Sequence, residues 1–490
     1  MRAIFSPSPK KLLLLPLIAA TFFMVSGGPY GMEDVLGGAG FGWAIVILLV
    51  VPLIWSLPTA LMIGELAAAI PDEGGFYVWV RRGLGSFWGY QEGWLSLSAS
   101  IFDMALYPSI FVLYLGKFSP ALTAAPRDYL WSLAVVVLCC AWNLRGAPSV
   151  GTDSVWMSVL LLAPFAVFIV LGFWRGLTLH PAIQWGRSAP SPDADVGLST
   201  AILVGLWNYM GWDNASTVAR DVHDPQRNYP RAIVGAIIIT VVTYVLPLAA
   251  MAVGGLSPDG FTTGSWAIAG GSLGGSLLSM AVVAGGVICG LGMFNALMMS
   301  YTRLPIAMAT DAMLPRIFEL RNRRGVPWVS VLFCGLAWAL AISLPFERLI
   351  SIDLILYGTS LILEFLALIA LRLREPQLPS APPSSSPTRS TPRAAKSSAT
   401  RAPPSPTSHL FFLLVGLPFS GRRSTGSQRF RSLAVALSPR LEPSSTLSSS
   451  MLAAARASAA YSLFPVFSVP CSLVPWLLTT DHCIYTGFPF

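Results

Sequence analysis

The chain has 490 residues, of which 54% are hydrophobic and only 11% are charged, whereas soluble domains carry roughly 25% charged residues. This composition excludes an ordinary soluble protein and predicts an all-α polytopic membrane protein. The formal net charge of +8 comes from residues 379–490, which hold 10 basic and 2 acidic residues, because residues 1–378 hold 21 of each. The predicted membrane part therefore has no basic stripe for nucleic acid.

Ten hydrophobic stretches predict ten membrane helices, since about 20 apolar residues cross a bilayer. In chain order they are residues 11–36, 41–70, 86–116, 129–147, 150–174, 197–218, 231–254, 274–300, 327–345 and 349–372. The first could also be a signal peptide, because Lys10 and Lys11 precede a leucine run. A glycine break and nine further spans follow it, which favours a membrane helix.

Basic residues predict the orientation of these helices. With the N-terminus in the cytoplasm, 16 basic residues lie in inner segments and 5 in outer loops, as expected when positive charge stays inside. We therefore predict a multi-pass protein of the plasma membrane with a cytoplasmic N-terminus. Because five is odd, residues 11–175 and 196–373 have opposite topology, which predicts a 5+5 inverted repeat within a core of residues 1–376.

The first span of each predicted repeat is interrupted at a corresponding place. Residues 25–34 read VSGGPYGMED and residues 206–214 read LWNYMGWDN. Backbone groups freed from helical bonding in lipid cost several kcal/mol each unless they line a cavity or meet protein. A matched pair of breaks predicts a secondary transporter with its site at the membrane midplane. The alternative is a glycine-proline kink that serves only packing.

The two breaks offer opposite backbone charges. Gly27 and Gly28 expose N–H groups at the start of a half-helix, which suits a carboxylate. Carbonyl groups before Gly211 suit an ammonium group, so that together the breaks suit a zwitterion. Asp103 lies in the middle of the third span and Asp213 in the second break. No Lys or Arg occupies a span interior, so these acids would take a proton or a cation, or hydrogen-bond a neighbouring helix.

Aromatic residues gather near both breaks and the third span, where they could bind a cation or simply pack. The sequence has no nucleotide-binding, metal-ligating or nucleophile motif, so it predicts neither an enzyme nor a cofactor. Residues 377–490 are rich in Ser, Pro and Arg. We expect them to form a disordered or divergent tail, with a shifted reading frame as one origin.

Five stretches carry a family resemblance: residues 25–34, 65–83, 103–108, 211–232 and 308–327. With these stretches the chain resembles the amino acid–polyamine–organocation permeases, near plant polyamine uptake transporters and bacterial amino acid permeases. The resemblance implies a LeuT-like core with discontinuous helices 1 and 6 and alternating access, normally followed by two more helices. It also implies a carboxylate-binding turn at Ser26 and Gly27, a gate at Trp207 and an acidic position at Asp213.

The residues and the resemblance together predict a set of substrate-binding positions. They are Ser26, Gly27, Gly28, Tyr30, Gly31, Asp103, Tyr107, Trp207, Tyr209, Gly211 and Asp213. Met24 stands where the polyamine branch typically has an acid, which weakens a polyamine assignment. The fifth span lacks the lysine that some proton-coupled relatives have there, so a proton and another ion both remain open as the coupling ion. We predict an amino acid permease, with a small-molecule substrate and the lipid bilayer as partners. The alternatives are a polyamine permease and a non-transporting sensor or inactive product.

Overall fold

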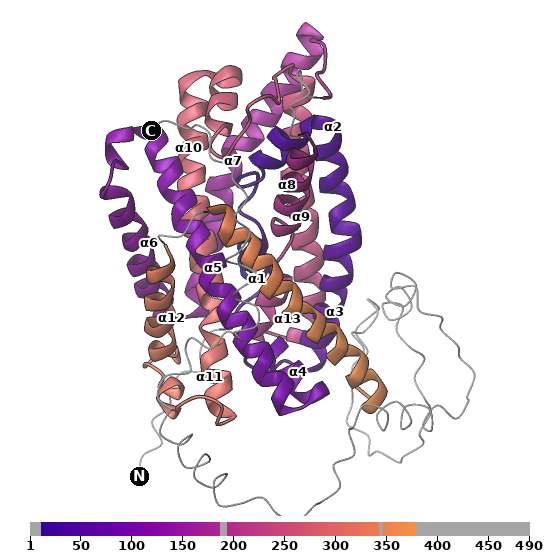
Figure 1. The fold of residues 1–490 in the computed structure, drawn as a ribbon, viewed down its shortest axis with the longest axis vertical. Coiled ribbons are helices and arrows are strands. Elements are labelled where there is room, and N and C mark those ends of the chain that lie inside the picture. The colour runs from indigo at the N-terminus through magenta and orange to yellow at the C-terminus, as the bar shows by residue number, and fades with distance from the viewer. Residues whose placement is uncertain (1–10, 187–193, 343–345, 379–490) are drawn as a thin grey trace, which may run out of the picture. The chain divides into compact units, whose positions relative to one another are not determined.

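The computed structural model describes residues 11–186, 194–342 and 346–378 (Figure 1). All but the first two residues of the predicted tail, 377–490, lie outside this part. The described chain is helical, with one isolated β-bridge between Leu12 and Val222. Its α-helices are α1 (Leu14–Val25), α2 (Glu33–Val51), α3 (Leu57–Ala69), α4 (Phe76–Leu84), α5 (Ser86–Phe118), α6 (Arg127–Asn143), α7 (Ala147–Leu179), α8 (Ala194–Trp207), α9 (Pro225–Val253), α10 (Trp266–Tyr301), α11 (Arg303–Thr310), α12 (Trp328–Ala341) and α13 (Phe346–Arg374).

Short helical turns complete the description. A π-helical turn, Pro52–Ser56, joins α2 to α3, and 3-10 turns span Pro120–Leu122, Trp212–Asp221 (η3) and Arg316–Glu319. Six helices or helix runs of the described chain are long and apolar enough to cross a membrane, and Leu14–Val25 and Trp328–Ala341 are shorter apolar helices. These features confirm the predicted all-α, multi-pass architecture.

Both predicted helix breaks are present. The first span consists of α1, a non-helical segment over 26–32 and the start of α2. Gly40 then divides α2 with φ 69° and ψ 174°, a conformation that glycine adopts far more readily than other residues. This kink lies between the first and second predicted spans. The sixth span consists of α8, a break over 208–211 and η3.

The eighth helix differs from its prediction, because α10 begins at Trp266 rather than near residue 274. Gly275, with φ 68°, separates this extra segment from the predicted span. Trp266 holds the segment in place by packing edge-on against Phe165 and Phe168 and by donating a hydrogen bond to the carbonyl of Pro29, 2.7 Å away. These contacts are tertiary, so hydropathy could not reveal them.

The two interrupted spans lie side by side. Helix α1 packs against α7, α9, α10 and η3. The backbone N–H of Leu12 donates to the carbonyl of Asp221, and the N–H of His223 donates to the carbonyl of Leu12, each at 2.8 Å. The start of α1 is thereby tied to the end of η3, and the residues of both breaks, 26–32 and 208–211, are buried.

A group of four charged residues, here called the Glu73 ion cluster, joins the segments next to this tie. It consists of Glu73, Asp221, Arg303 and Arg321. Arg303, only 5% exposed, contacts Glu73 and Asp221, each at 2.7 Å, and Arg321 contacts Glu73 at 2.5 Å. Burial acts to raise the pKa of Glu73, but the charges and hydrogen bonds of Arg303 and Arg321 outweigh it and lower the pKa below its usual value. The cluster thus links four places: the segment before α4, the end of η3, the start of α11 and the segment after α11.

Candidate functional site

The first break is a turn whose amide groups are held by the chain itself. Gly28 and Gly31 have φ of 73° and 86°. The N–H of Gly28 donates to the hydroxyl of Ser26 at 3.1 Å, and the N–H of Gly31 donates to Glu33 Oε2 at 2.7 Å. The N–H of Gly28, which the sequence assigns to a substrate carboxylate, and the nearby N–H of Gly31 are therefore both occupied, the latter by a carboxylate of the protein.

Glu33 also joins the first break to other segments. These segments lie at the end of the bundle opposite the Glu73 ion cluster. Its Oε1 accepts hydrogen bonds from the hydroxyl of Tyr114 and from the N–H of Gly264, the latter at 3.1 Å. Next to it, the hydroxyl of Thr263 donates to Asp34 at 2.7 Å. Glu33 is fully buried, so it links the first break, α5 and the segment before α10.

The second break is built around Gly211, which has φ of 88°. A Cβ at this position would lie 2.6 Å from the carbonyl oxygen of Met24, so the second break touches the end of α1, next to the first break, through the backbone. The N–H of Gly211 donates to the hydroxyl of Tyr357 at 3.0 Å, and that hydroxyl donates to Asp213 Oδ1 at 2.5 Å. Tyr357 of α13 therefore locks the second break and orients Asp213.

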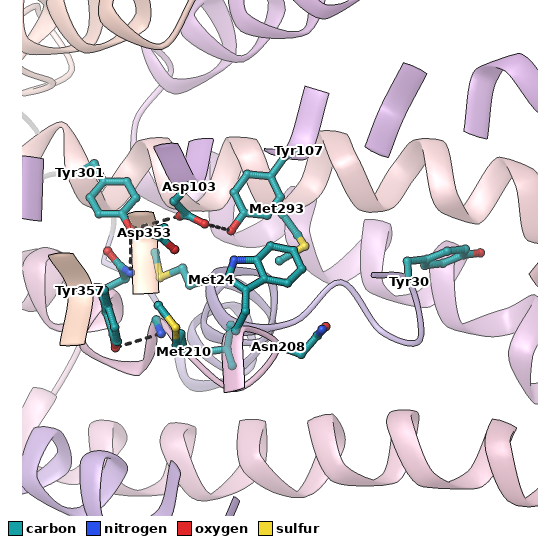
Figure 2. A pocket seen from close by; sticks show the side chains of 14 residues that line it. Met24, Tyr30, Asp103, Tyr107, Asn208, Met210, Met293, Tyr301, Asp353 and Tyr357 are labelled. Carbon is teal, nitrogen blue, oxygen red and sulfur yellow. Dashed lines mark hydrogen bonds between the residues drawn. The ribbon is translucent and has the colours of Figure 1, made fainter. Parts of the chain in front are cut away.

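A small cavity lies between the breaks, with a volume of about 20 Å³, which is close to the size of one water molecule. Figure 2 shows the side chains around it. It is lined by Met24, Val25, Tyr30, Asp103, Tyr107, Trp207, Asn208, Met210, Gly211, Asn214, Met293, Tyr301, Asp353 and Tyr357. No Lys or Arg is among these described lining residues. This space is much smaller than an organic substrate, so it must widen to admit one.

Asp103 is the centre of the polar side of this cavity. Its Oδ1 accepts a hydrogen bond from Tyr107 at 2.6 Å, and its Oδ2 accepts one from Tyr301 at 3.2 Å. Asp353 lies next to Asp103 and Tyr301 in Figure 2 and interacts electrostatically with Asp103 and Asp213. All three carboxyl groups are at least 94% buried. Acidic groups gathered without a basic lining residue attract cationic groups.

An aromatic wall faces these acids. The rings of Tyr107 and Trp207 stack at 6.4 Å with an interplanar angle of 22°. Gly31 lies against the indole, because a Cβ there would be 3.3 Å from its Cζ3. Aromatic faces attract ammonium groups, so this wall complements the carboxylates. The gating role of Trp207 stays a prediction, and its position between Tyr107 and the first break is compatible with that role.

The structure brings only part of the predicted site together at the cavity. Tyr30, Asp103, Tyr107, Trp207 and Gly211 line it. Tyr30 lies far from Asp103 in Figure 2, and its hydroxyl donates to the carbonyl of Val282 at 2.6 Å. The other predicted residues, which are not in the cavity lining, are Ser26, Gly27, Gly28, Gly31, Tyr209 and Asp213. Tyr209 instead donates to the carbonyl of Leu48 at 2.8 Å.

Sequence reasoning missed the contribution of α13. Asp353 and Tyr357 are one helical turn apart on this helix and both line the cavity. Asp353 lies near the start of the predicted span 349–372, although an acid and a tyrosine at spacing i, i+4 share one helix face. Tyr301, at the end of α10, was likewise missed. The polar residues along one face of the tenth span indicate its contribution to the cavity, whereas its hydropathy does not.

We expect Gly211→Ala to destabilise the protein by about 2 kcal/mol or more, because a left-handed alanine costs about 1–2 kcal/mol and its Cβ would collide with the Met24 carbonyl. Thermal unfolding in detergent measures this effect. Gly358→Ala is the matched control, because it adjoins Tyr357 and its Cβ would meet nothing within 4 Å. Equal melting temperatures for the two variants would contradict the close approach of the breaks.

Comparisons with known proteins identify the family. The profile of the amino acid permease family matches residues 18–425. A probable polyamine transporter of Arabidopsis thaliana is 34% identical over 369 residues, which cover 75% of this chain and 73% of that protein. Polyamine transporter PUT1 of Oryza sativa subsp. japonica is 36% identical over 75% of this chain and 68% of its own length. The serine/threonine exchanger SteT of Bacillus subtilis (strain 168) is 24% identical over 74% of this chain and 82% of that protein.

A solved structure supports the fold. The crystal structure of MhsT in complex with L-phenylalanine matches with a TM-score of 0.51 at 16% identity, covering 74% of this chain and 89% of that chain. This likeness confirms the predicted LeuT-like arrangement of helices. With the family match, it also confirms a membrane transporter rather than an enzyme. The chain belongs to the amino acid permease family.

Proposed function

We propose that this permease carries polyamines, which are flexible chains with two or more ammonium groups. The observation that carries the proposal is the approach of Asp103 and Asp353 in one buried cavity, with Asp213 held behind Tyr357. A substrate with several positive charges pairs these acids, which have no basic partner in the described cavity lining. Several relatives named as polyamine transporters support this choice of substrate.

The first break also favours a substrate without a carboxylate. Ser26 and Glu33 already accept hydrogen bonds from the N–H groups of Gly28 and Gly31. A substrate carboxylate would compete with the buried side chain of Glu33 for this turn. Met24 lines the cavity where the polyamine branch typically has an acid, and we propose that Asp353 supplies the second carboxylate from α13.

Amino acids are the second candidate. The Ser26–Gly28 turn lies beside the start of a half-helix, where partial positive charge favours anions, and SteT is named a serine/threonine exchanger. In this alternative the amino group pairs with Asp103 and the carboxylate displaces Glu33 from Gly31. Binding of either substrate without flux would favour the sensor or inactive product.

The proposed mechanism is alternating access driven by the two broken spans. The bundle of spans 1, 2, 6 and 7 rocks against the remaining helices, and Trp207 closes the cavity over the bound cation. We place the N-terminus in the cytoplasm and the protein in the plasma membrane. The Glu73 ion cluster then closes the cytoplasmic side, and the contacts of Glu33 with Tyr114 and Gly264 close the outer side.

Counterflow uptake in proteoliposomes of the full chain tests the proposal. Putrescine, spermidine, arginine, serine, leucine and glutamate are compared in parallel. We expect saturable exchange of putrescine and spermidine, with amino acid flux at least about tenfold lower, because each unpaired buried charge costs well over 1.4 kcal/mol. Serine or leucine exchange without putrescine exchange would replace polyamines by amino acids as the substrate class.

A further inference from the structure

Two buried glutamates lie between the cavity and the end of the bundle where α4 packs. Glu92 of α5 and Glu364 of α13 are both 0% exposed. Neither oxygen of Glu364 has a hydrogen-bond partner among the described residues, and Glu92 Oε2 also has none. Glu92 and Asp213 both lie near enough to Glu364 to interact with it electrostatically. An ionised carboxylate without a partner in such a place is strongly disfavoured.

The glutamates belong to a polar seam between two apolar helices, α5 and α13, which pack against each other. Ser360 and Ser96 both donate to Glu92 Oε1, Ser96 at 3.1 Å, and their hydroxyl oxygens are 3.0 Å apart. The seam residues repeat every three or four positions, so each set follows one helix face. They are Glu92, Ser96, Ser100, Asp103 and Tyr107 on α5 and Asp353, Tyr357, Ser360 and Glu364 on α13.

The cations near the seam are engaged elsewhere. On α4, Arg81 pairs with Asp311 at 2.8 Å and Arg82 pairs with Glu375 at 2.5 Å. Arg372 of α13 pairs with Glu65 of α3.

The remaining ionisable neighbours are accounted for as well. Tyr77 of α4 donates to Asp311, and Tyr357 interacts with Glu364 from its own helix. The part of α8 whose side chains are described, residues 197–207, contains no ionisable residue. Val80, Leu363 and Ala367 form an apolar cluster between α4 and α13, so the side chains beside Glu364 supply no counter-charge.

We propose that Glu92 and Glu364 together form a proton-binding site, and that a cation entering the cavity displaces this proton. The pair holds one proton, which leaves as H⁺ while the pair becomes more negative. Asp213 connects the two sites, because it interacts electrostatically with both glutamates and is held by the cavity residue Tyr357. A cation beside Asp103 and Asp353 offsets part of the negative field that retains the proton. This coupling rests on the proposed polyamine function.

Linkage gives the coupling a measurable form, since proton and cation must weaken each other's binding by the same factor. Putrescine should therefore release about one proton per molecule bound to purified protein in weakly buffered solution, and its affinity should rise with pH. Glu364→Gln keeps the shape of the side chain but cannot exchange a proton. We expect this variant to bind putrescine, to release no proton and to lose most of the pH dependence.

Glu375→Gln is the matched control, because it removes a carboxylate near the end of α13 that is exposed and paired with Arg82. It should behave as the wild type does. Proton release by Glu364→Gln equal to that of the wild type would overturn the inference and assign the proton to the cavity acids. Putrescine binding by the wild type without proton release would also overturn it, while leaving polyamine binding established.

Infrared difference spectroscopy tests the proton site without any substrate. A carbonyl-stretch band of a protonated carboxyl group near neutral pH should be present in the wild type and in Glu375→Gln, and reduced in Glu364→Gln. An unchanged band would overturn the inference even if no tested compound binds. Failure of every compound to bind, together with loss of the band in Glu364→Gln, would reject the polyamine proposal and retain the proton site.

Discussion

Replacing Asp103 with Asn should lower kcat/KM for putrescine uptake by about 100-fold. The change removes a negative charge but keeps a side chain of the same shape beside Tyr107 and Tyr301. A hydrogen bond to a charged group contributes about 1.5–3 kcal/mol, and each 1.4 kcal/mol corresponds to a factor of ten. Because Asp103 is buried in a cavity without basic lining residues, the effect should lie near the upper end of that range.

Initial rates of uptake into proteoliposomes over a range of putrescine concentrations measure this effect. Asp153→Asn is the matched control, since Asp153 accepts hydrogen bonds from Trp142 and Ser149 at 2.7 and 3.2 Å and lies outside the cavity lining. The control should transport nearly as the wild type does. Uptake that is unchanged in Asp103→Asn for every cationic substrate would reject the role of Asp103 in binding.

Replacing Arg303 with Met should strongly destabilise the protein at the Glu73 ion cluster. Arg303 is buried between Glu73 and Asp221, and removal of one partner from a buried ion pair costs about 3–5 kcal/mol. Glu73 keeps Arg321 and, at 3.8 Å, Arg220, but Asp221 loses the ion pair that ties it to the cluster, so this side of the protein should also open more often. Thermal unfolding and labelling of a cysteine placed in the cavity measure the two effects.

Arg82→Met is the control for this experiment, because Arg82 and Glu375 form an exposed pair whose loss should change stability little. Equal melting temperatures for Arg303→Met and Arg82→Met would contradict the structural importance of the Glu73 ion cluster. Faster labelling in Arg303→Met, but not in Arg82→Met, is the expected sign of opening at the cluster.

The same cluster predicts how stability depends on pH. The pKa of Glu73 is lowered in the folded protein, because its arginine partners outweigh the effect of burial. A group of this kind stabilises the fold fully above its unfolded pKa of about 4.5 and loses that contribution as the pH falls through the lower folded pKa. The difference in stability between wild type and Arg303→Met should therefore be large at about pH 7 and shrink below about pH 4, as thermal unfolding at both pH values can show.

Local chemistry in the sequence was sufficient to locate the helix breaks and the central acid. Glycines and a proline within an apolar run mark the first break, and Asp103 is conspicuous in the middle of a span. The rotation of α13 was not predictable, because it depends on packing against α5. For that reason Asp353 and Tyr357 were missed. Glu33 lies just past the first break in the sequence, but its hydrogen bond with the Gly31 amide depends on a fold that joins α5 and the segment before α10.

Three methionines in the cavity wall bear on the range of substrate lengths. Met24, Met210 and Met293 come from three different segments, and methionine has an unbranched side chain with three rotatable bonds. These side chains can withdraw to different extents while the helix backbones stay in place. Under the proposed function, diamines and triamines of unequal length would then share one set of carboxylates. Oxidation of the thioethers to sulfoxides would stiffen and polarise the same wall, making substrate range sensitive to the redox state of the membrane environment.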